Sequence, residues 1–304
     1  MGTRKTAKRK VKNNPDNDLL LHASVAGSLM IDKKGAVITP IQLAELEAFL
    51  FREEQAKLDP KKRLTAKMTE KKEYLIAKRD KPFELSDTAK TMLEQVWRQN
   101  VKNIPNLVTS KYMEKGLWVE EEAITLLTEV DGRFYVKNKE RKFDDMFTGE
   151  CDINSVIPDV GKVIQDVKAN WDSVTFMGAK LTPLWEWQGR VYMELYDADE
   201  FWLRCCLMDA PSHILEGEKF RFASRHGIID QETPEAEALI DAFERTMMFS
   251  NNPTITPRER VKTFKIKRDK ELFKEIRKRV PVAREYYRTI QLNQTREDYG
   301  EAAY

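Results

Sequence analysis

The feature that most constrains the fold is the segment KVIQDVKA, residues 162–169, an apolar run that ends in an acid and a lysine. Side chains alternate between the two faces of a β-strand, so Asp166 and Lys168 share one face and Val167 points toward the core. Burying a charged group without a partner costs several kcal/mol. This ending therefore predicts a strand whose buried charges are compensated by neighbouring groups.

Residue spacing predicts the remaining elements. Apolar residues at intervals of three and four predict helices over 39–58, 85–100, 110–132, 172–180, 183–196, 210–227, 233–249 and 269–291, and Pro281 is expected to kink or divide the last of them. Short β-branched and aromatic runs predict strands over 133–138, 145–153, 162–169, 200–209 and 260–267. The highly charged segment 59–81 is expected to form an exposed helix or a hairpin arm.

This order of elements predicts an α/β fold in which helices flank a small mixed central β-sheet, with helical additions at the N- and C-terminal ends. No linker rich in proline or glycine interrupts it. We therefore expect one domain over 19–297, with its core at about 109–208, a basic disordered tail over 1–18 and a flexible end over 298–304. The tail is dense in lysine and arginine, and its alternative role is an arm that touches phosphates.

Composition narrows the class of protein. The chain has 52 Lys and Arg against 50 Asp and Glu, a net charge of +2, so any contact with DNA must use locally concentrated basic residues. Cys151, Cys205 and Cys206 form no CxxC pair, which disfavours a zinc knuckle or a disulfide framework and favours a reducing, cytoplasmic setting. No uninterrupted apolar stretch approaches the roughly 18 residues of a membrane helix.

Several acids are expected to converge on Asp166 and Lys168. The expected strand that pairs with theirs carries Asp152 near its end, and the preceding helix carries Glu120, Glu121 and Glu122. Converging carboxylates suit Mg²⁺, which prefers oxygen ligands, and a metal-activated water beside a lysine can hydrolyse a phosphodiester. The alternatives are an ordinary surface ion pair and a solvated face of the helix.

The motifs GLWVEEEA, GECDI, DVK and WQGRVY, beginning at residues 116, 149, 166 and 187, resemble the PD-(D/E)XK nuclease superfamily. The resemblance is closest to its branch of lambda-type exonucleases and YqaJ-like phage recombinases, and it covers about residues 20–290. The superfamily fold, with a restriction-endonuclease-like core, is the α/β arrangement expected above. His22 departs from the pattern because many relatives have an arginine there, which weakens an expected phosphate contact.

The resemblance also implies residue roles. It implies that Asp152, Asp166 and the Val167 carbonyl bind metal and that Glu120 holds a second metal or its water. Lys168 resembles the catalytic lysine, and Gln188 resembles the residue that contacts the scissile region or orients that lysine. The residues expected to contact DNA are Ser24, Lys111, Trp171 and Tyr192. Trp171 and Trp187 are expected either to stack on an unpaired base or to be core aromatic residues. Tyr192 is expected either to contact DNA or only to pack inside the fold.

The function implied is a DNA nuclease that depends on Mg²⁺, with Mn²⁺ as a substitute. A phage-type double-strand exonuclease of recombination or DNA processing fits best. An endonuclease of the same fold and a non-catalytic DNA-binding or scaffold protein are the alternatives, and a kinase is disfavoured because no glycine-rich loop is present. The implied partners are DNA, a single-strand annealing protein and further copies of the chain.

Overall fold

The computed structural model describes residues 19–32, 38–106 and 110–292. The expected basic tail and the expected flexible C-terminal end lie outside these ranges. Within them, none of the helices combines the length and apolarity that crossing a membrane requires.

Two small mixed sheets form the centre of the molecule, where the sequence predicted one. The larger has the order β4-β5-β6-β7 and contains one parallel pair, β5 with β6. Its strands are β4 (Ile153–Ile157), β5 (Gly161–Asn170), β6 (Glu200–Leu207) and β7 (Val261–Lys267). The smaller has the order β1-β3-β2, with β1 (Leu21–His22), β2 (Lys142–Phe143) and β3 (Phe147–Gly149). The α/β fold with helices around a small mixed sheet is confirmed.

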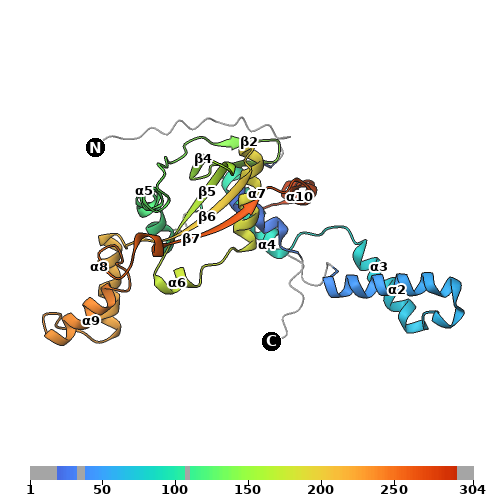
Figure 1. The fold of residues 1–304 in the computed structure, drawn as a ribbon, viewed down its shortest axis with the longest axis horizontal. Coiled ribbons are helices and arrows are strands. Elements are labelled where there is room, and N and C mark those ends of the chain that lie inside the picture. Colours follow the sequence, from blue (N-terminus) through green and yellow to red (C-terminus); the bar gives the residue numbers. More distant parts are fainter. Residues whose placement is uncertain (1–18, 33–37, 107–109, 293–304) are drawn as a thin grey trace.

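Helices flank the two sheets (Figure 1). They are α1 (Ala23–Ala26), α2 (Pro40–Leu58), α3 (Ala66–Arg79), α4 (Asp87–Val101), α5 (Lys111–Asp131), α6 (Ser173–Met177), α7 (Pro183–Tyr196), α8 (Ser212–Arg225), α9 (Pro234–Glu244) and α10 (Lys270–Thr289), with 3₁₀ turns η1 (Gly27–Met30), η2 (Pro60–Lys62) and η3 (Pro257–Arg260). Helices α2, α3 and α9 project away from the sheets (Figure 1). Helix α10 contains Pro281 and continues past it, so the expected division of this helix is wrong.

Helices α5 and α7 cover opposite faces of the larger sheet and so position the site. The main hydrophobic cluster joins Ile164 of β5 and Leu203 of β6 to α7, whereas Val167 of β5 packs in a second cluster with α5. Asp166 and Lys168 alternate with Val167 and share one face, as strand alternation predicts, and that face is the one covered by α7. Gly189 lets α7 approach β6, because a Cβ there would lie 2.1 Å from Phe201 Cδ1.

Capping residues fix where these two helices begin and end. The Ser110 side chain accepts a hydrogen bond from the Met113 amide at the start of α5, and Gly132 ends the helix with a φ of 60°, which favours glycine. Thr182 caps α7 through the Trp185 amide, and Pro183 occupies its first position. Because the caps fix the ends of α5 and α7, they also fix the positions of Glu120 and Gln188 along the sheet.

Two strand predictions were wrong in detail. Segment 133–138 does not form a strand. It pairs with β4 only through an isolated bridge between Lys137 and Ile153. Segment 145–153 is divided between β3, in the smaller sheet, and the first residue of β4. Asp152 therefore lies immediately before β4, which forms the hairpin with β5.

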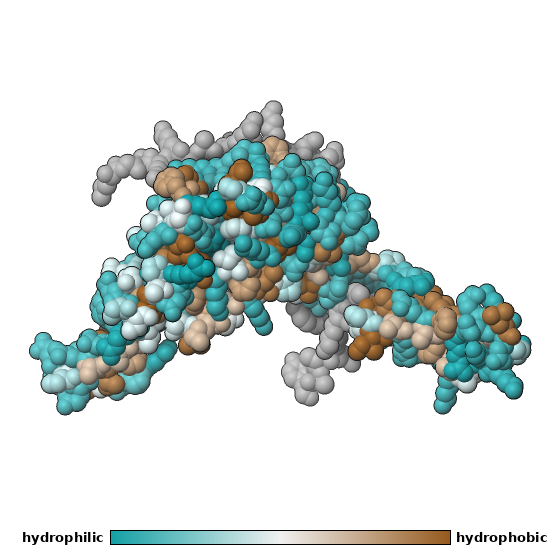
Figure 2. Space-filling view, in the orientation of Figure 1, coloured by the Kyte–Doolittle hydropathy of each residue, from teal (hydrophilic) through white to brown (hydrophobic). Residues whose placement is uncertain are grey.

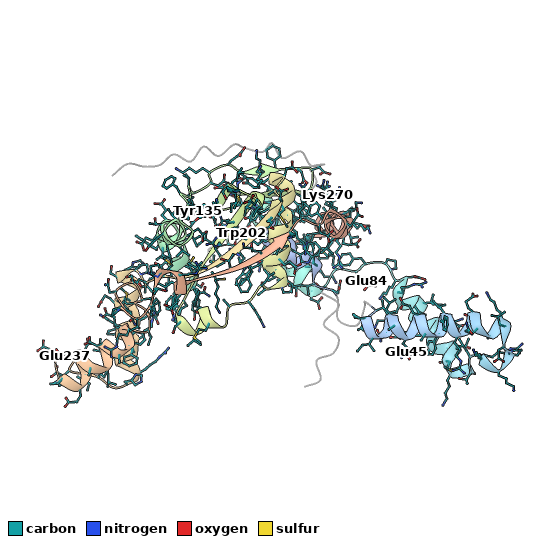
Figure 3. The ribbon with its side chains drawn as sticks, in the orientation of Figure 1. Glu45, Glu84, Tyr135, Trp202, Glu237 and Lys270 are labelled. Carbon is teal, nitrogen blue, oxygen red and sulfur yellow. The ribbon has the colours of Figure 1, made fainter. Side chains whose placement is uncertain are left out.

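Helices α2 and α3 form a hairpin that extends from the body of the molecule, hereafter the arm (Figure 1). Segment 59–81, expected to be an exposed helix or a hairpin arm, supplies η2 and α3 of this arm. Figure 3 labels Glu45 on the arm and Glu84 where the chain returns to the body.

Candidate active site

Asp166 is a buried carboxylate with two side-chain neighbours of different kinds. Its side chain is 4% exposed, and its Oδ2 lies 2.6 Å from Lys168 Nζ. Its Oδ1 accepts a hydrogen bond of 3.1 Å from Gln188 Nε2. The contact with Lys168 is an ion pair without hydrogen-bond alignment, so the buried Oδ2 accepts no hydrogen bond. Asp166 therefore faces a cation through Oδ2 and an amide donor through Oδ1.

Asp152 lies beside Asp166 where β4 begins. Its Oδ2 accepts a hydrogen bond of 2.6 Å from the Val167 amide. Burial, and next the negative charge of Asp166, raise the pKa of Asp152 to about 7. A buried carboxylate and a half-buried one that repel each other in this way are a site for a cation.

The Val167 carbonyl faces the same edge of β5 as Asp152. The N–H and C=O of one strand residue point toward the same neighbouring strand, and the Val167 N–H reaches Asp152. The last β4 residue on this side is Ile153, which is paired with Gln165. The carbonyl thus lies beyond the end of the β4 ladder, in the position that the resemblance assigns to a metal ligand.

Lys168 is held as a cation. Burial alone would lower the pKa of Lys168, but the charge of Asp166 and its contact, followed by Asp152, outweigh burial and raise it. The side chain is still 32% exposed, so the ammonium lies between the buried acids and the surface. It can therefore contact both the carboxylates and a molecule that approaches from solvent.

Of the three consecutive glutamates on α5, Glu120, Glu121 and Glu122, only Glu120 turns toward this site. Its side chain is 18% exposed, whereas Glu121 and Glu122 are exposed. Its negative charge contributes to the raised pKa of Asp152. This agrees with the rotation of about 100° per helical residue, which separates the three side chains.

Glu120 is paired with a residue that the sequence analysis missed. Lys137 Nζ lies 2.8 Å from Glu120 Oε2, and this hydrogen bond is the largest cause of the raised pKa of Lys137. The bridge between Lys137 and Ile153 places the lysine next to Asp152. The sequence does show a basic residue, Lys137, between α5 and Asp152. Its pairing with Glu120 could not be predicted, because it depends on a contact between segments that are distant in the sequence.

The oxygen atoms at this site suit a divalent cation that is bound by only a few protein ligands. Among residues 19–32, 38–106 and 110–292, no three His, Cys, Asp or Glu side chains are grouped closely enough to hold a metal ion as they stand. Glu120 is drawn away by Lys137, which leaves Asp152, Asp166 and the Val167 carbonyl. Mg²⁺ keeps several waters and uses one or two carboxylates, so these residues fit it.

Gln188 and Tyr192 form a chain of hydrogen bonds behind Asp166. Gln188 Nε2 also donates to Tyr192 Oη at 3.2 Å, and Tyr192 Oη donates to the Glu150 carbonyl at 3.0 Å. Tyr192, expected to contact DNA, is instead 5% exposed and packs against Gly149. Gln188 therefore hydrogen-bonds to Asp166, which in turn pairs with Lys168, and Tyr192 accepts a hydrogen bond from Gln188.

Ser24 lies on the surface at the start of α1, after His22. Arg141 Nη1 lies 3.4 Å from His22 Nδ1, and Arg141 Nη2 pairs with Glu150 at 3.2 Å. Partial desolvation and then the charge of Arg141 lower the pKa of His22. A guanidinium from a distant segment thus lies beside the position where the sequence has histidine.

Lys111 and Trp171 are close together at the other end of the site. Lys111 Nζ lies 4.8 Å from the centre of the Trp171 ring and pairs with Glu218 at 2.9 Å. Tyr112 packs edge-on against Trp171 with 4.9 Å between ring centres. Trp171 is partly buried against a small hydrophobic cluster, and Trp187 is partly buried against the main one, so both serve packing.

Comparison with solved structures identifies the fold. A phage-related exonuclease from Haemophilus somnus 129PT is 23% identical and superposes with a TM-score of 0.56, covering 89% of this chain and 94% of that one. The chain has the fold of a phage-related exonuclease. An alkaline exonuclease from Laribacter hongkongensis, LHK-Exo, gives a TM-score of 0.44 at 10% identity over 67% of this chain and 82% of that one. No family model and no curated protein matches the sequence.

Proposed function

We propose that this chain is a DNA nuclease that depends on a divalent metal, and that it degrades DNA from its ends. The observation that carries this proposal is the neighbouring pair of carboxylates, half-buried Asp152 and buried Asp166, with Lys168 Nζ 2.6 Å from Asp166 Oδ2. The fold of a solved phage-related exonuclease supports it. A non-catalytic DNA-binding protein would have no use for two carboxylates that destabilise each other.

The residues divide the work of hydrolysis in this proposal. Mg²⁺, or Mn²⁺ in its place, would be held by Asp152, Asp166 and the Val167 carbonyl, and would supply a polarised phosphate and an activated water. Lys168 orients the attacking water from the solvent side of the acids. Gln188 holds Asp166 in its rotamer through the 3.1 Å hydrogen bond. If its ion pair with Lys137 breaks, Glu120 adds a third carboxylate beside Asp152 and Asp166.

Within this proposal the substrate is the end of double-stranded DNA. The matched structure is named an exonuclease, which supports cleavage from an end, and an endonuclease of the same fold is the second candidate. A role in phage recombination, a single-strand annealing protein as partner and a cytoplasmic location are further parts of the proposal. They rest on the resemblance and, for the location, on the three cysteines, which are all free and buried.

A time course on two DNA substrates tests this function. With Mg²⁺, we expect loss of label from end-labelled linear duplex and no nicking of covalently closed circles, because an exonuclease needs a terminus. Chelation by EDTA is the control and should stop the reaction. Cleavage of the circles would favour the endonuclease, and no cleavage of either substrate would contradict the proposal.

The glutamates on α5 provide an internal comparison. Glu120→Gln should reduce Mg²⁺-dependent cleavage about 100-fold, because it removes the one α5 carboxylate whose charge reaches Asp152. Glu121→Gln is the matched control, since that side chain is exposed and should leave the rate unchanged. Initial rates on linear duplex measure both variants. The opposite pattern would mean that α5 presents a different glutamate to the site.

A further inference from the structure

The turn between α2 and α3, residues 59–67, forms the end of the arm that lies farthest from the body (Figure 1). Its sequence, DPKKRLTAK, holds four cationic residues, hereafter the tip cations, and one acid, Asp59. The tip cations are Lys61, Lys62, Arg63 and Lys67, and all of them are exposed. Four positive charges and one negative charge give this turn a net charge of +3, larger than the +2 of the whole chain.

The tip cations are not neutralised within the arm. None of them pairs with an acidic side chain of the described residues, and Lys62 Nζ instead lies 3.1 Å from the uncharged Gln55 Oε1. The single acid, Asp59, accepts a hydrogen bond from the Lys61 backbone amide. Four cations elsewhere on the arm do have acidic partners, and these pairs are Lys57 with Glu54, Lys71 with Glu45, Lys72 with Glu53 and Arg79 with Asp80. The fold thus balances much of the charge along the arm and leaves it unbalanced at the tip.

The stability of the arm does not account for the tip cations. Lys67 lies in the first turn of α3, the end of a helix at which the peptide dipoles favour an acid and disfavour a cation. No acidic residue lies in that turn. The consecutive side chains of Lys61, Lys62 and Arg63 also repel one another. Binding of an anion relieves both costs, so the cluster favours an anionic ligand.

The anion that fits this turn is a phosphate backbone, because the turn itself exposes little apolar surface. Leu64, its only large apolar side chain, is partly buried, and the outer end of the arm is mostly hydrophilic in Figure 2. A segment that binds a membrane presents a whole apolar face beside its cations. Here Leu58 is exposed just before the turn, but the next exposed large apolar residue of α2, Phe51, lies about 10 Å back along the helix. Duplex DNA, with one negative charge about every 1.7 Å of its axis, needs only cations.

We propose that the tip cations bind the phosphate backbone of duplex DNA at a distance from the candidate active site. This inference rests on the proposed function, which brings duplex DNA to the chain. Helix α2 has 19 residues and is about 28 Å long, the axial length of about eight base pairs. The arm thus holds the duplex at a second place, away from the end that is cleaved. Because the contact is with phosphates, it positions the DNA without reading its sequence.

Equilibrium binding of the full chain in EDTA tests the tip without relying on cleavage. The tip variant Lys61→Gln/Arg63→Gln/Lys67→Gln should bind a long duplex at least about tenfold more weakly than the parent at low salt, because it removes up to three phosphate contacts. For the same reason the slope of log affinity against log salt should flatten by about 2–3. A hairpin of about six base pairs is shorter than the arm and cannot occupy the body and the tip together, so parent and variant should bind it equally well.

The charge-matched control is Lys81→Gln/Lys274→Gln/Lys278→Gln. These three lysines are also exposed, but each pairs with a glutamate three residues away. The control changes the net charge as much as the tip variant does, and it should bind the long duplex within about twofold of the parent, because salt screens charges that do not touch the DNA. An equal loss in both triple variants, or an equal loss by the tip variant on the short hairpin, would overturn the proposal.

These results are separable from those of the cleavage test. A parent that cuts no DNA but shows the tip effect would support the tip and contradict the nuclease. A parent that cuts DNA while its tip variant binds long duplex normally would overturn the tip and leave the nuclease standing. Vesicles that contain phosphatidylserine test the competing anionic surface. If the parent binds them, the tip variant does not, and DNA affinity is unchanged, the tip contacts a membrane and the proposal is wrong.

Discussion

Asp152→Asn is expected to lower Mg²⁺-dependent cleavage of linear duplex by about a thousandfold while making the metal-free protein more stable at pH 8. Cleavage falls because the variant removes one of the two carboxylates beside Lys168. The fold is retained because the amide oxygen can still accept the hydrogen bond from Val167 N–H. Initial rates and urea denaturation, each measured with and without Mg²⁺, test the two halves of this prediction.

The direction of the stability change follows from the pKa of Asp152, which the fold raises to about 7 from an ordinary value near 3.8. The folded protein then binds this proton more tightly than the unfolded chain, so stability falls as pH rises from about 4 to 7 and stays reduced above 7. Asparagine does not titrate. Its advantage should be absent near pH 4 and about 1–3 kcal/mol at pH 8. Added Mg²⁺ should narrow the difference by stabilising the parent.

Asp159→Asn is the matched control for this variant. Asp159 is an exposed acid in the same β4–β5 hairpin, with a φ of 66° that asparagine also adopts readily. It should cleave and unfold like the parent at every pH. Parental cleavage by Asp152→Asn, or a stability advantage that does not depend on pH, would show that Asp152 is not part of a coupled acidic pair with Asp166.

Local geometry explains what the sequence could predict of the site. Asp166 and Lys168 share a face of β5 because strand alternation depends only on the strand itself. Glu120 is the inward glutamate because helix rotation separates it from Glu121. Ser110 and Gly132 mark the ends of α5, because capping uses residues adjacent to the helix. Each of these features is determined within one element.

The features that sequence reasoning missed depend on contacts between distant segments. Lys137 reaches Glu120 because its short segment touches β4 at a single point. Arg141 lies beside His22 only because the smaller sheet brings β1 and β2 to either side of β3. Tyr192 is buried because Gly149 allows its ring to approach the backbone. No spacing within one element encodes these pairs.

Lys168→Met is expected to lower the turnover of bound DNA by about 100- to 10,000-fold, the range for loss of a group that assists proton transfer. DNA affinity should change little, because one lysine is a small part of a contact with many phosphates, and the slope of log affinity against log salt should change by less than about 1. Single-turnover cleavage and equilibrium binding at several salt concentrations measure the two effects separately.

Lys168→Arg separates the charge of this residue from the position of its ammonium group. Arginine keeps a cation near Asp166, whose side chain is 4% exposed, and so preserves the ion pair that the fold contains. Because the planar guanidinium cannot place its donors where the compact ammonium does, this variant should cleave as slowly as Lys168→Met if Lys168 orients the water. Recovery of parental turnover in Lys168→Arg would assign Lys168 the role of a fixed charge. Equal losses of binding and cleavage in Lys168→Met would make it a DNA-binding residue and remove it from the chemistry.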